Sequence, residues 1–174
     1  SVCYSSDGKK ILSGSDDCIV KEWSVASGEC LKNINGHSSS VKSVCYSPDG
    51  NKILSGSNDK TIKEWLVESG ECLQTLQGHF AGVSCVSYSP NGKKILSGSN
   101  DGIIKEWSVD SGECLLSLVG HNNRVLSVSY YPNGEKILSS SRDSKVKEWL
   151  VTSGECLKTL IGHSSSSGVC YSPD

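Results

Sequence analysis

The four tryptophans of this chain are spaced at a constant interval of 42 residues, and its four histidines follow the same interval. The positions are Trp23, Trp65, Trp107 and Trp149, and His37, His79, His121 and His163. A fixed period of this length indicates one supersecondary unit repeated in tandem. It also argues against an enzyme, because a nucleophile and its base are needed once, in one open pocket, whereas these residues recur in every copy.

Composition excludes several classes of protein. The 174 residues carry a formal net charge of −2, which gives no argument for binding nucleic acid or an anionic membrane. The apolar runs are too short for a transmembrane helix. The chain opens without the basic and apolar segments of a signal peptide, and it contains no Met. We therefore expect an intracellular, cytoplasmic protein, and we expect Ser1 to begin partway through a longer gene product.

Nine cysteines raise the question of disulfides and metal binding. Their number is odd and no Cys-x-x-Cys pair occurs. Four of them follow the repeat within Gly-Glu-Cys-Leu segments: Cys30, Cys72, Cys114 and Cys156. A small buried hydrophobic residue suits a strand at this place, so we expect reduced structural thiols, with no metal and no cofactor. Reduced thiols fit a reducing, intracellular compartment.

Short apolar runs within each copy predict four β-strands and no helix. In the second copy these runs cover residues 43–47, 52–57, 61–67 and 71–76. They are rich in Val, Ile, Thr, Tyr and Trp, and the first turn, Pro-Asp-Gly, is typical of a tight hairpin. One four-stranded sheet cannot cover both of its faces, so we expect the copies to pack face to face in a ring.

The repeated motifs point to a known family. Gly-His, then a strand ending in Ser-Pro-Asp-Gly, then Leu-Ser-Gly-Ser-x-Asp and Ile-Lys-x-Trp, resembles the WD-repeat (WD40) β-propeller family over essentially the whole chain. The resemblance implies an all-β propeller of four-stranded antiparallel blades. Four blades are expected, at about 1–36, 37–78, 79–120 and 121–162, with a partial repeat at 163–174. The resemblance further implies a non-catalytic scaffold that binds a protein or peptide.

In that family the histidine, a Ser or Thr on the second strand, an Asp in the next turn and the Trp form a hydrogen-bonded structural relay. The resemblance implies three complete sets: His37-Ser55-Asp59-Trp65, His79-Ser97-Asp101-Trp107 and His121-Ser139-Asp143-Trp149. A buried imidazole between a carboxylate and a hydroxyl satisfies polar groups inside a blade. Hydrolase triads use the same residue types, but a set in every blade, without a Gly-x-Ser-x-Gly elbow, favours the structural role.

The Trp-Asp dipeptide that names the family is absent, and a glutamate precedes every tryptophan: Glu22, Glu64, Glu106 and Glu148. Relatives mostly carry an apolar residue here, facing a neighbouring blade, and an unpaired carboxylate in a dry seam is costly. We expect each glutamate to reach the solvated end of its seam or to pair with a lysine, such as the one beside it: Lys21, Lys63, Lys105 or Lys147. The alternative is a cation held by a ring of carboxylates.

The two ends of the array complement each other. The first copy has Ser13, Asp17 and Trp23 but no preceding histidine, whereas His163 has no Ser, Asp and Trp after it. We expect a second chain to supply the missing histidine, so that two chains close an eight-bladed ring as a head-to-tail homodimer. The alternative is that the chain is an excerpt of a longer array.

The C-terminal segment copies the opening of the first blade at a shifted spacing. Residues 169–174 repeat the Val-Cys-Tyr-Ser pattern of residues 2–7, and Cys170 lies one residue short of the position that the repeat predicts. Two arrangements of this segment are consistent with the sequence. The segment pairs imperfectly at the end of the array, or it competes with residues 1–5 for the same inner-strand position.

Propellers of this family typically bind partners on the face formed by the loops before the first strand and between the second and third strands of each blade. Phe80 is the only Phe of the chain, and Arg124 and Arg142 are its only arginines; all three are predicted on this face. Aromatic and Arg residues often anchor interfaces, so they are our candidate protein-binding residues. The alternative is local packing of Phe80 and solvated arginines.

Two functions remain open. Residues that vary between copies on one face favour an interaction scaffold. Copies that are nearly identical elsewhere favour a consensus-like or engineered self-assembling propeller, whose activity is ring formation.

Overall fold

The structure of the protein is a computed structural model that describes residues 1–162 and 168–171. Sixteen β-strands in this part of the chain form four separate four-stranded sheets, which we call blades and number from the N-terminus. Strands are paired in chain order within each blade, and every pairing is antiparallel. The described residues contain no helix that is long and apolar enough to cross a membrane. The expected all-β architecture of four antiparallel blades is confirmed.

The strand bounds repeat closely from blade to blade. Blade 1 contains β1 (Val2–Tyr4), β2 (Lys10–Gly14), β3 (Val20–Ser24) and β4 (Cys30–Ile34). Blade 2 contains β5 (Val41–Tyr46), β6 (Lys52–Ser57), β7 (Thr61–Leu66) and β8 (Cys72–Gln77). Blade 3 contains β9 (Val83–Tyr88), β10 (Lys94–Ser99), β11 (Ile103–Ser108) and β12 (Cys114–Val119). Blade 4 contains β13 (Val125–Tyr130), β14 (Lys136–Ser141), β15 (Lys145–Leu150) and β16 (Cys156–Ile161).

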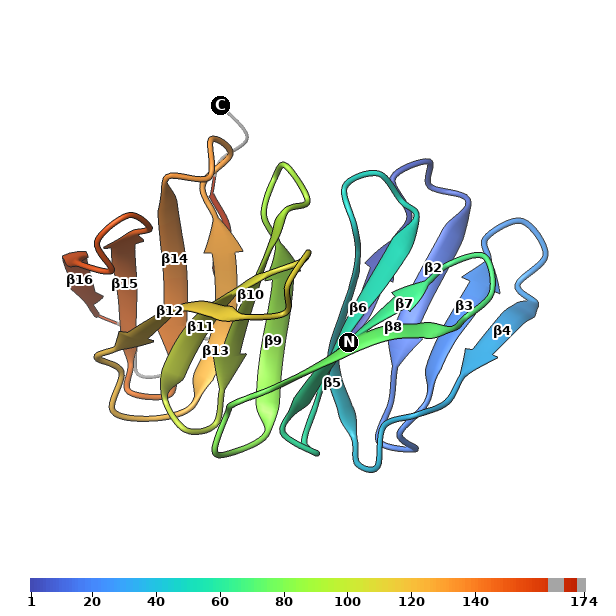
Figure 1. Ribbon diagram of the computed structural model, residues 1–174, viewed down its shortest axis with the longest axis horizontal. Helices are drawn as coiled ribbons and strands as arrows, with labels where there is room; N and C mark the ends of the chain where they lie inside the picture. Colours follow the sequence, from blue (N-terminus) through green and yellow to red (C-terminus); the bar gives the residue numbers. More distant parts are fainter. Residues whose placement is uncertain (163–167, 172–174) are drawn as a thin grey trace.

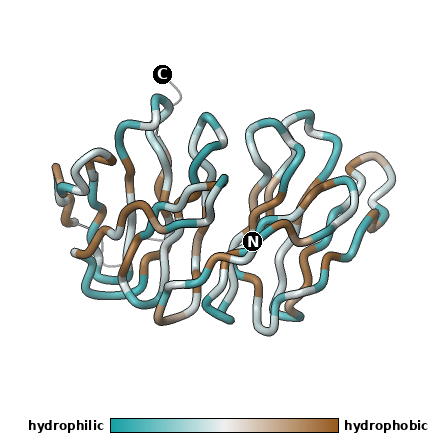
Figure 2. The backbone as a smooth tube through the Cα atoms, viewed as in Figure 1, coloured by the Kyte–Doolittle hydropathy of each residue, from teal (hydrophilic) through white to brown (hydrophobic). Residues whose placement is uncertain are grey.

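The hairpin turns set the register of each blade. Gly50 has a φ of 74° and donates its N–H to Ser47 O at 2.9 Å, closing the β5–β6 turn. Glycine adopts this left-handed conformation without steric cost. The resulting register pairs Ile53 with both Tyr46 and Trp65. Figure 2 shows the outcome along the chain, with hydrophobic stretches in the strands and hydrophilic residues at many of the turns.

Each blade has two chemically different faces, because successive side chains of a strand point to opposite sides. In blade 2 the register places Tyr46, Ile53 and Trp65 on one side, which we call the tryptophan face. Leu54 and Glu64 are paired on the other side, which we call the glutamate face. The same two faces recur in the other blades.

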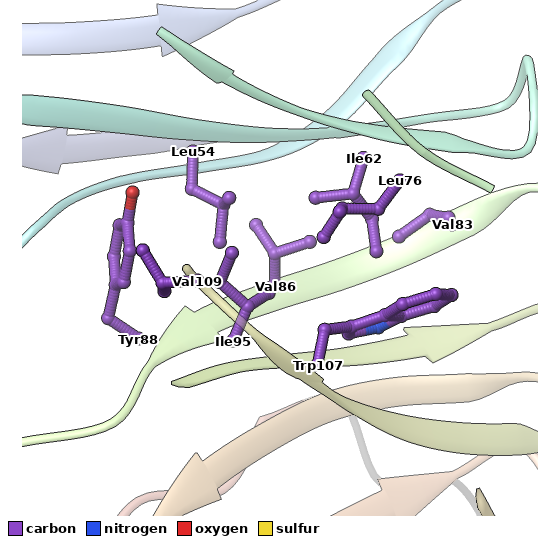
Figure 3. Close-up of a cluster of buried hydrophobic side chains, with 9 residues drawn as sticks. All are labelled: Leu54, Ile62, Leu76, Val83, Val86, Tyr88, Ile95, Trp107 and Val109. Atoms are coloured by element: carbon purple, nitrogen blue, oxygen red, sulfur yellow. The ribbon is translucent and has the colours of Figure 1, made fainter. Parts of the chain in front are cut away.

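The apolar core lies in the seams, where the tryptophan face of one blade packs on the glutamate face of the blade before it. In the middle seam, Figure 3 shows the side chains of the two blades pointing toward one another. Blade 2 contributes Leu54, Ile62 and Leu76, and blade 3 contributes Val83, Val86, Tyr88, Ile95, Trp107 and Val109. Equivalent residues fill the seams between blades 1 and 2 and between blades 3 and 4.

The row of blades is open at both ends. The blades follow one another in chain order, from blade 1 (blue) at one end to blade 4 (red) at the other (Figure 1). On the tryptophan face of blade 1, Tyr4 is 65% exposed, whereas Tyr88 at the same position of blade 3 is 7% exposed. On the glutamate face of blade 4, Leu160 is 57% exposed, whereas Leu118 of blade 3 is 2% exposed. Among the described residues, the blades therefore leave a half-seam open at each end of the row.

The cysteines of the Gly-Glu-Cys-Leu segments are not buried, contrary to our expectation. Cys30, Cys72 and Cys114 are exposed, and Cys156 is half-buried. Each is the first residue of the outermost strand of its blade, which has a neighbouring strand on one side only. The buried thiol is Cys85 on β9, where burial raises the pKa to about 12. All nine cysteines lie in the described residues, and none forms a disulfide.

Candidate functional site

The structure brings three of the expected His-Ser-Asp-Trp sets together, one in each of blades 2, 3 and 4. In blade 2, His37 Nε2 lies 2.7 Å from Ser55 Oγ, and His37 Nδ1 lies 2.8 Å from Asp59 Oδ2. The indole of Trp65 donates to Ser55 Oγ at 2.8 Å. The other two sets make the same contacts: His79, Ser97, Asp101 and Trp107, and His121, Ser139, Asp143 and Trp149.

The chemistry of the blade 2 set favours a neutral histidine. Burial lowers the pKa of His37, and the hydrogen bond and charge of Asp59 offset only part of this effect. Burial alone would raise the pKa of Asp59, but hydrogen bonds from Thr61, His37 and the N–H of Ser38 lower it to about 2. A proton on Nδ1 of His37 is then donated to the carboxylate, while Nε2 accepts the hydroxyl of Ser55.

Burial also argues against a catalytic serine. Ser55 is fully buried, and its Oγ already contacts His37 and Trp65. A nucleophile must reach a substrate in an open pocket. The set instead ties the loop before β5 and the turn after β6 to β7, so it fixes two loops on the same side of the blade.

Blade 1 holds an incomplete set. Trp23 Nε1 donates to Ser13 Oγ at 2.8 Å, and Asp17 Oδ1 accepts the N–H of Ile19 at 3.0 Å. The histidines of the described residues contact the aspartates of blades 2, 3 and 4, and none of them contacts Asp17. His163, expected to complete a set across two chains, lies outside the described residues.

The seam glutamates find partners that the sequence did not suggest. Glu64 accepts a hydrogen bond from Lys52 Nζ at 3.3 Å and from the hydroxyl of Tyr88 in blade 3 at 2.7 Å. Gln74 Nε2 donates to the second carboxylate oxygen at 2.9 Å. Burial and the charge of Glu64 raise the pKa of Tyr88, so its phenol stays protonated and can donate. The buried carboxylate is therefore paired and fully hydrogen-bonded.

The same arrangement crosses the other two interior seams. Tyr46 donates to Glu22 at 2.9 Å, and Tyr130 donates to Glu106 at 2.8 Å. We call each group of one lysine, one glutamate and one tyrosine a seam bridge: Lys10, Glu22 and Tyr46; Lys52, Glu64 and Tyr88; Lys94, Glu106 and Tyr130. Sequence reasoning missed these tyrosines, although each follows its glutamate by 24 residues.

The expected pairing with a lysine is confirmed, but the partner is not the adjacent lysine, because neighbours along a strand lie on opposite faces. Lys63 lies on the tryptophan face of blade 2, where Nζ is 5.9 Å from the centroid of the Trp65 ring and donates to Thr75 Oγ1 at 2.8 Å. The equivalent lysines also lie over their tryptophans: Lys21, Lys105 and Lys147. Within the described residues, no group of three or more His, Cys, Asp or Glu side chains is arranged to hold a metal ion.

Comparison with known proteins agrees with this geometry. The family model described as "WD domain, G-beta repeat" matches residues 1–24, 28–65, 70–108 and 112–149. The chain belongs to the WD40 repeat family. A WD40 relative, the F-box/WD repeat-containing protein 7 of Drosophila melanogaster, is 44% identical over 41 residues, which is 24% of this chain and 3% of that protein. That similarity covers about one WD40 repeat. WD40 domains generally serve as non-catalytic interaction scaffolds.

We call the side of the blades formed by the loops before each first strand and between each second and third strand the loop face. It carries the three candidate binding residues, in blades 3 and 4. Phe80, in the β8–β9 loop, is 79% exposed, and its N–H donates to Asp101 Oδ2 at 3.0 Å. The loops of the two arginines are adjacent, since Arg142 N–H donates to Arg124 O at 2.9 Å. Arg142 is exposed, whereas Arg124 is half-buried and its Nε has no partner among the described residues. Phe80 and Arg142 are thus the side chains displayed to solvent.

Proposed function

We propose that this WD40 chain is a non-catalytic scaffold that binds a protein or peptide on its loop face. The observation that carries the proposal is an exposed Phe80 and an exposed Arg142 on loops that are anchored by the buried relays. Aromatic and Arg side chains on ordered loops are suited to anchor an interface, because little conformational freedom is lost on binding.

A paired substitution tests this proposal. We expect the double variant Phe80→Ala/Arg142→Ala to lose partners that the parent chain retains from a cell lysate. The matched control is Leu115→Ala/Lys93→Ala, which removes one exposed apolar side chain from the outer strand β12 and one exposed cationic side chain from the β9–β10 turn. Equal recovery of all partners by the two double variants would contradict a binding site at Phe80 and Arg142.

Ring assembly is our second proposed function, as the activity of a consensus-like, self-assembling propeller. The two uncovered half-seams carry the residue types that fill the interior seams. The tryptophan face of blade 1 presents Val2, Tyr4, Ile11 and Trp23, and the glutamate face of blade 4 presents Leu138, Val146 and Leu160. Head-to-tail packing of two chains would bury both faces in an eight-bladed homodimer. A solution mass that stays monomeric at every concentration would contradict it.

We also propose an intracellular, cytoplasmic location. All nine cysteines are unpaired, and three of the Gly-Glu-Cys-Leu cysteines are exposed. Free exposed thiols persist in reducing compartments, whereas oxidising ones convert them to disulfides. Fractionation of cells that produce the protein, with thiol labelling of each fraction, tests this location; recovery in an oxidised, secreted fraction would contradict it.

A further inference from the structure

The segment 168–171 partly fills the half-seam of blade 4. Tyr171 donates its hydroxyl to Glu148 Oε1 at 3.4 Å, and Lys136 Nζ lies 3.5 Å from the same oxygen. A lysine, a glutamate and a tyrosine therefore meet as in an interior seam bridge. Ser127 Oγ also donates to Val169 O at 3.4 Å, which brings the segment 168–171 alongside the inner strand β13.

This fourth bridge is looser than the interior ones. The interior tyrosine-to-glutamate distances are 2.7 to 2.9 Å, compared with 3.4 Å for Tyr171. The side chain of Glu148 is 16% exposed, whereas that of Glu64 is 2% exposed. A hydrogen bond that is longer and more open to water contributes less to stability, so another tyrosine can displace this one.

Blade 4 departs from the other copies where it meets this segment. Tyr131 stands where the other copies have serine, as at Ser89. The Ser89 hydroxyl accepts the N–H of Lys94 at 2.9 Å and orders its turn. The ring of Tyr131 instead packs edge-on against Tyr171, with centroids 4.9 Å apart. The copy next to the C-terminal segment has exchanged a turn hydrogen bond for an aromatic contact with it.

A second departure from the repeat, at Ser140, makes the glutamate face of blade 4 less able to pack closely against a following blade. Ser140 replaces a glycine that the first three copies keep, as at Gly98. A Cβ at Gly98 would lie 2.5 Å from Val125 Cγ1 of the following blade. Ser140 carries such a Cβ, so a following blade with Val at that position would have to shift. In blade 1 the residue that would face Ser140 is Val2, the counterpart of Val44. Val44 Cγ1 would lie 3.0 Å from a Cβ at Gly14. The segment 168–171 and Ser140 therefore both oppose close packing of blade 1 of a second copy.

The opposite end of the row has a tyrosine without a carboxylate. Tyr4 is the blade 1 counterpart of Tyr46 and Tyr88, which bond to the glutamate of the preceding blade. Tyr4 makes no side-chain hydrogen bond with the described residues, and it is largely exposed. In a head-to-tail pair, the carboxylate at the matching position is Glu148 of the second copy.

We propose that Tyr171 of the same chain and Tyr4 of a second copy compete for Glu148, so that the C-terminal segment restrains ring closure. The proposal rests on the ring assembly proposed above. The tryptophan face of blade 1 then packs on the glutamate face of blade 4 of the other copy, and Tyr4 and Glu148 form the polar contact of this interface. The segment 168–171 competes with blade 1 of the other copy for the same face.

Sedimentation equilibrium of the 174-residue chain and three variants of the same length tests the competition. We expect Tyr171→Ala to lower the dimer dissociation constant by about tenfold, because no hydrogen bond to a charged group must be given up on association. Tyr4→Phe in the Tyr171→Ala background should raise it again by about tenfold. The matched control is Tyr88→Phe, which removes the same hydroxyl from an interior seam and should leave the dissociation constant unchanged.

Each other result has a definite meaning. Equal dissociation constants for the parent and Tyr171→Ala would overturn the competition and leave ring closure intact. A weaker dimer for Tyr171→Ala would also overturn it, because Tyr171 would then support the interface. If Tyr4→Phe left the dissociation constant of the Tyr171→Ala variant unchanged, Tyr4 would not bind Glu148 and the competition would be overturned. Monomers for every variant at every concentration would overturn ring assembly, and this inference with it.

Discussion

At the scale of single residues, a glutamate inside an apolar seam is tolerated because its partners come from both sides of the seam. Lys52 and Gln74 belong to the same blade as Glu64, and Tyr88 belongs to the next. Removing one member of such a buried group leaves the others unsatisfied, which costs more than the net contribution of the group itself. Glu22, Glu64 and Glu106 are almost fully buried, whereas the side chain of Glu148 is 16% exposed, so Glu148 provides an internal comparison.

The first prediction uses this comparison. Glu64→Ala should lower the free energy of unfolding by about 3 kcal/mol, since Tyr88, Lys52 and Gln74 lose their acceptor in a buried seam. Glu148→Ala should lower it by about 1 kcal/mol, since the Glu148 carboxylate is partly solvated and its hydrogen bonds are long. Urea unfolding of both variants provides the measurement. Equal losses of unfolding free energy in the two variants would show that burial of the glutamate does not determine the cost of removing it.

The second prediction concerns the stability of the fold at acidic pH. The pKa values of His37, His79 and His121 are lowered in the folded chain, mainly by burial. The unfolded chain therefore binds protons first as the pH falls below about 6.5, and stability decreases by up to about 1.4 kcal/mol per pH unit for each histidine. The lowered pKa of Asp59 adds a further loss between about pH 4 and pH 2. Stability that stays constant or rises from pH 7 to pH 5 would contradict neutral buried histidines.

At the scale of strands and turns, local patterns were enough to predict each element but not every partner. The turn after Tyr46 and the apolar run that follows it predicted β5 and β6 to within about two residues. The relay around His37 was expected from the resemblance to the WD-repeat family rather than from the repeat spacing alone. The contact from Tyr88 to Glu64 could not be derived from one blade, because it forms only when two blades pack. Exposure of Cys72 likewise depends on which strand is outermost.

The third prediction tests how closely the inner strand approaches the neighbouring blade. Gly98→Ser should destabilise the chain by about 2 kcal/mol, because the new Cβ would lie 2.5 Å from Val125 Cγ1 and 2.6 Å from Cys85 Sγ. Ser140→Ala, at the same position of blade 4, should instead stabilise by about 1 kcal/mol, because it removes a buried hydroxyl with no partner among the described residues. Thermal unfolding of the two variants gives the comparison. A lower stability for both variants would contradict the proposed difference between the interior seam at Gly98 and the half-seam at Ser140.

At the scale of the whole molecule, stability is distributed over three interior seams, and association depends on the two half-seams at the ends. Each interior seam buries a tryptophan from the following blade, so Trp65, Trp107 and Trp149 are all 2% exposed. Trp23 faces the uncovered end and is only half-buried. The chain therefore carries one tryptophan that reports on the end of the row and three that report on its interior.

The fourth prediction uses Trp23 as the reporter of ring closure. In the monomer, acrylamide should quench Trp23 far more than the three interior tryptophans, because it alone lies on an uncovered face. Association through that face buries Trp23 against the apolar glutamate face of blade 4, so quenching should fall and the emission should shift to shorter wavelength as protein concentration rises. Val25→Ala, which alters the same face beside Trp23 without removing the indole, should move this transition to higher concentration. A dimer in which Trp23 stays as accessible as in the monomer would show that the two chains meet through another surface.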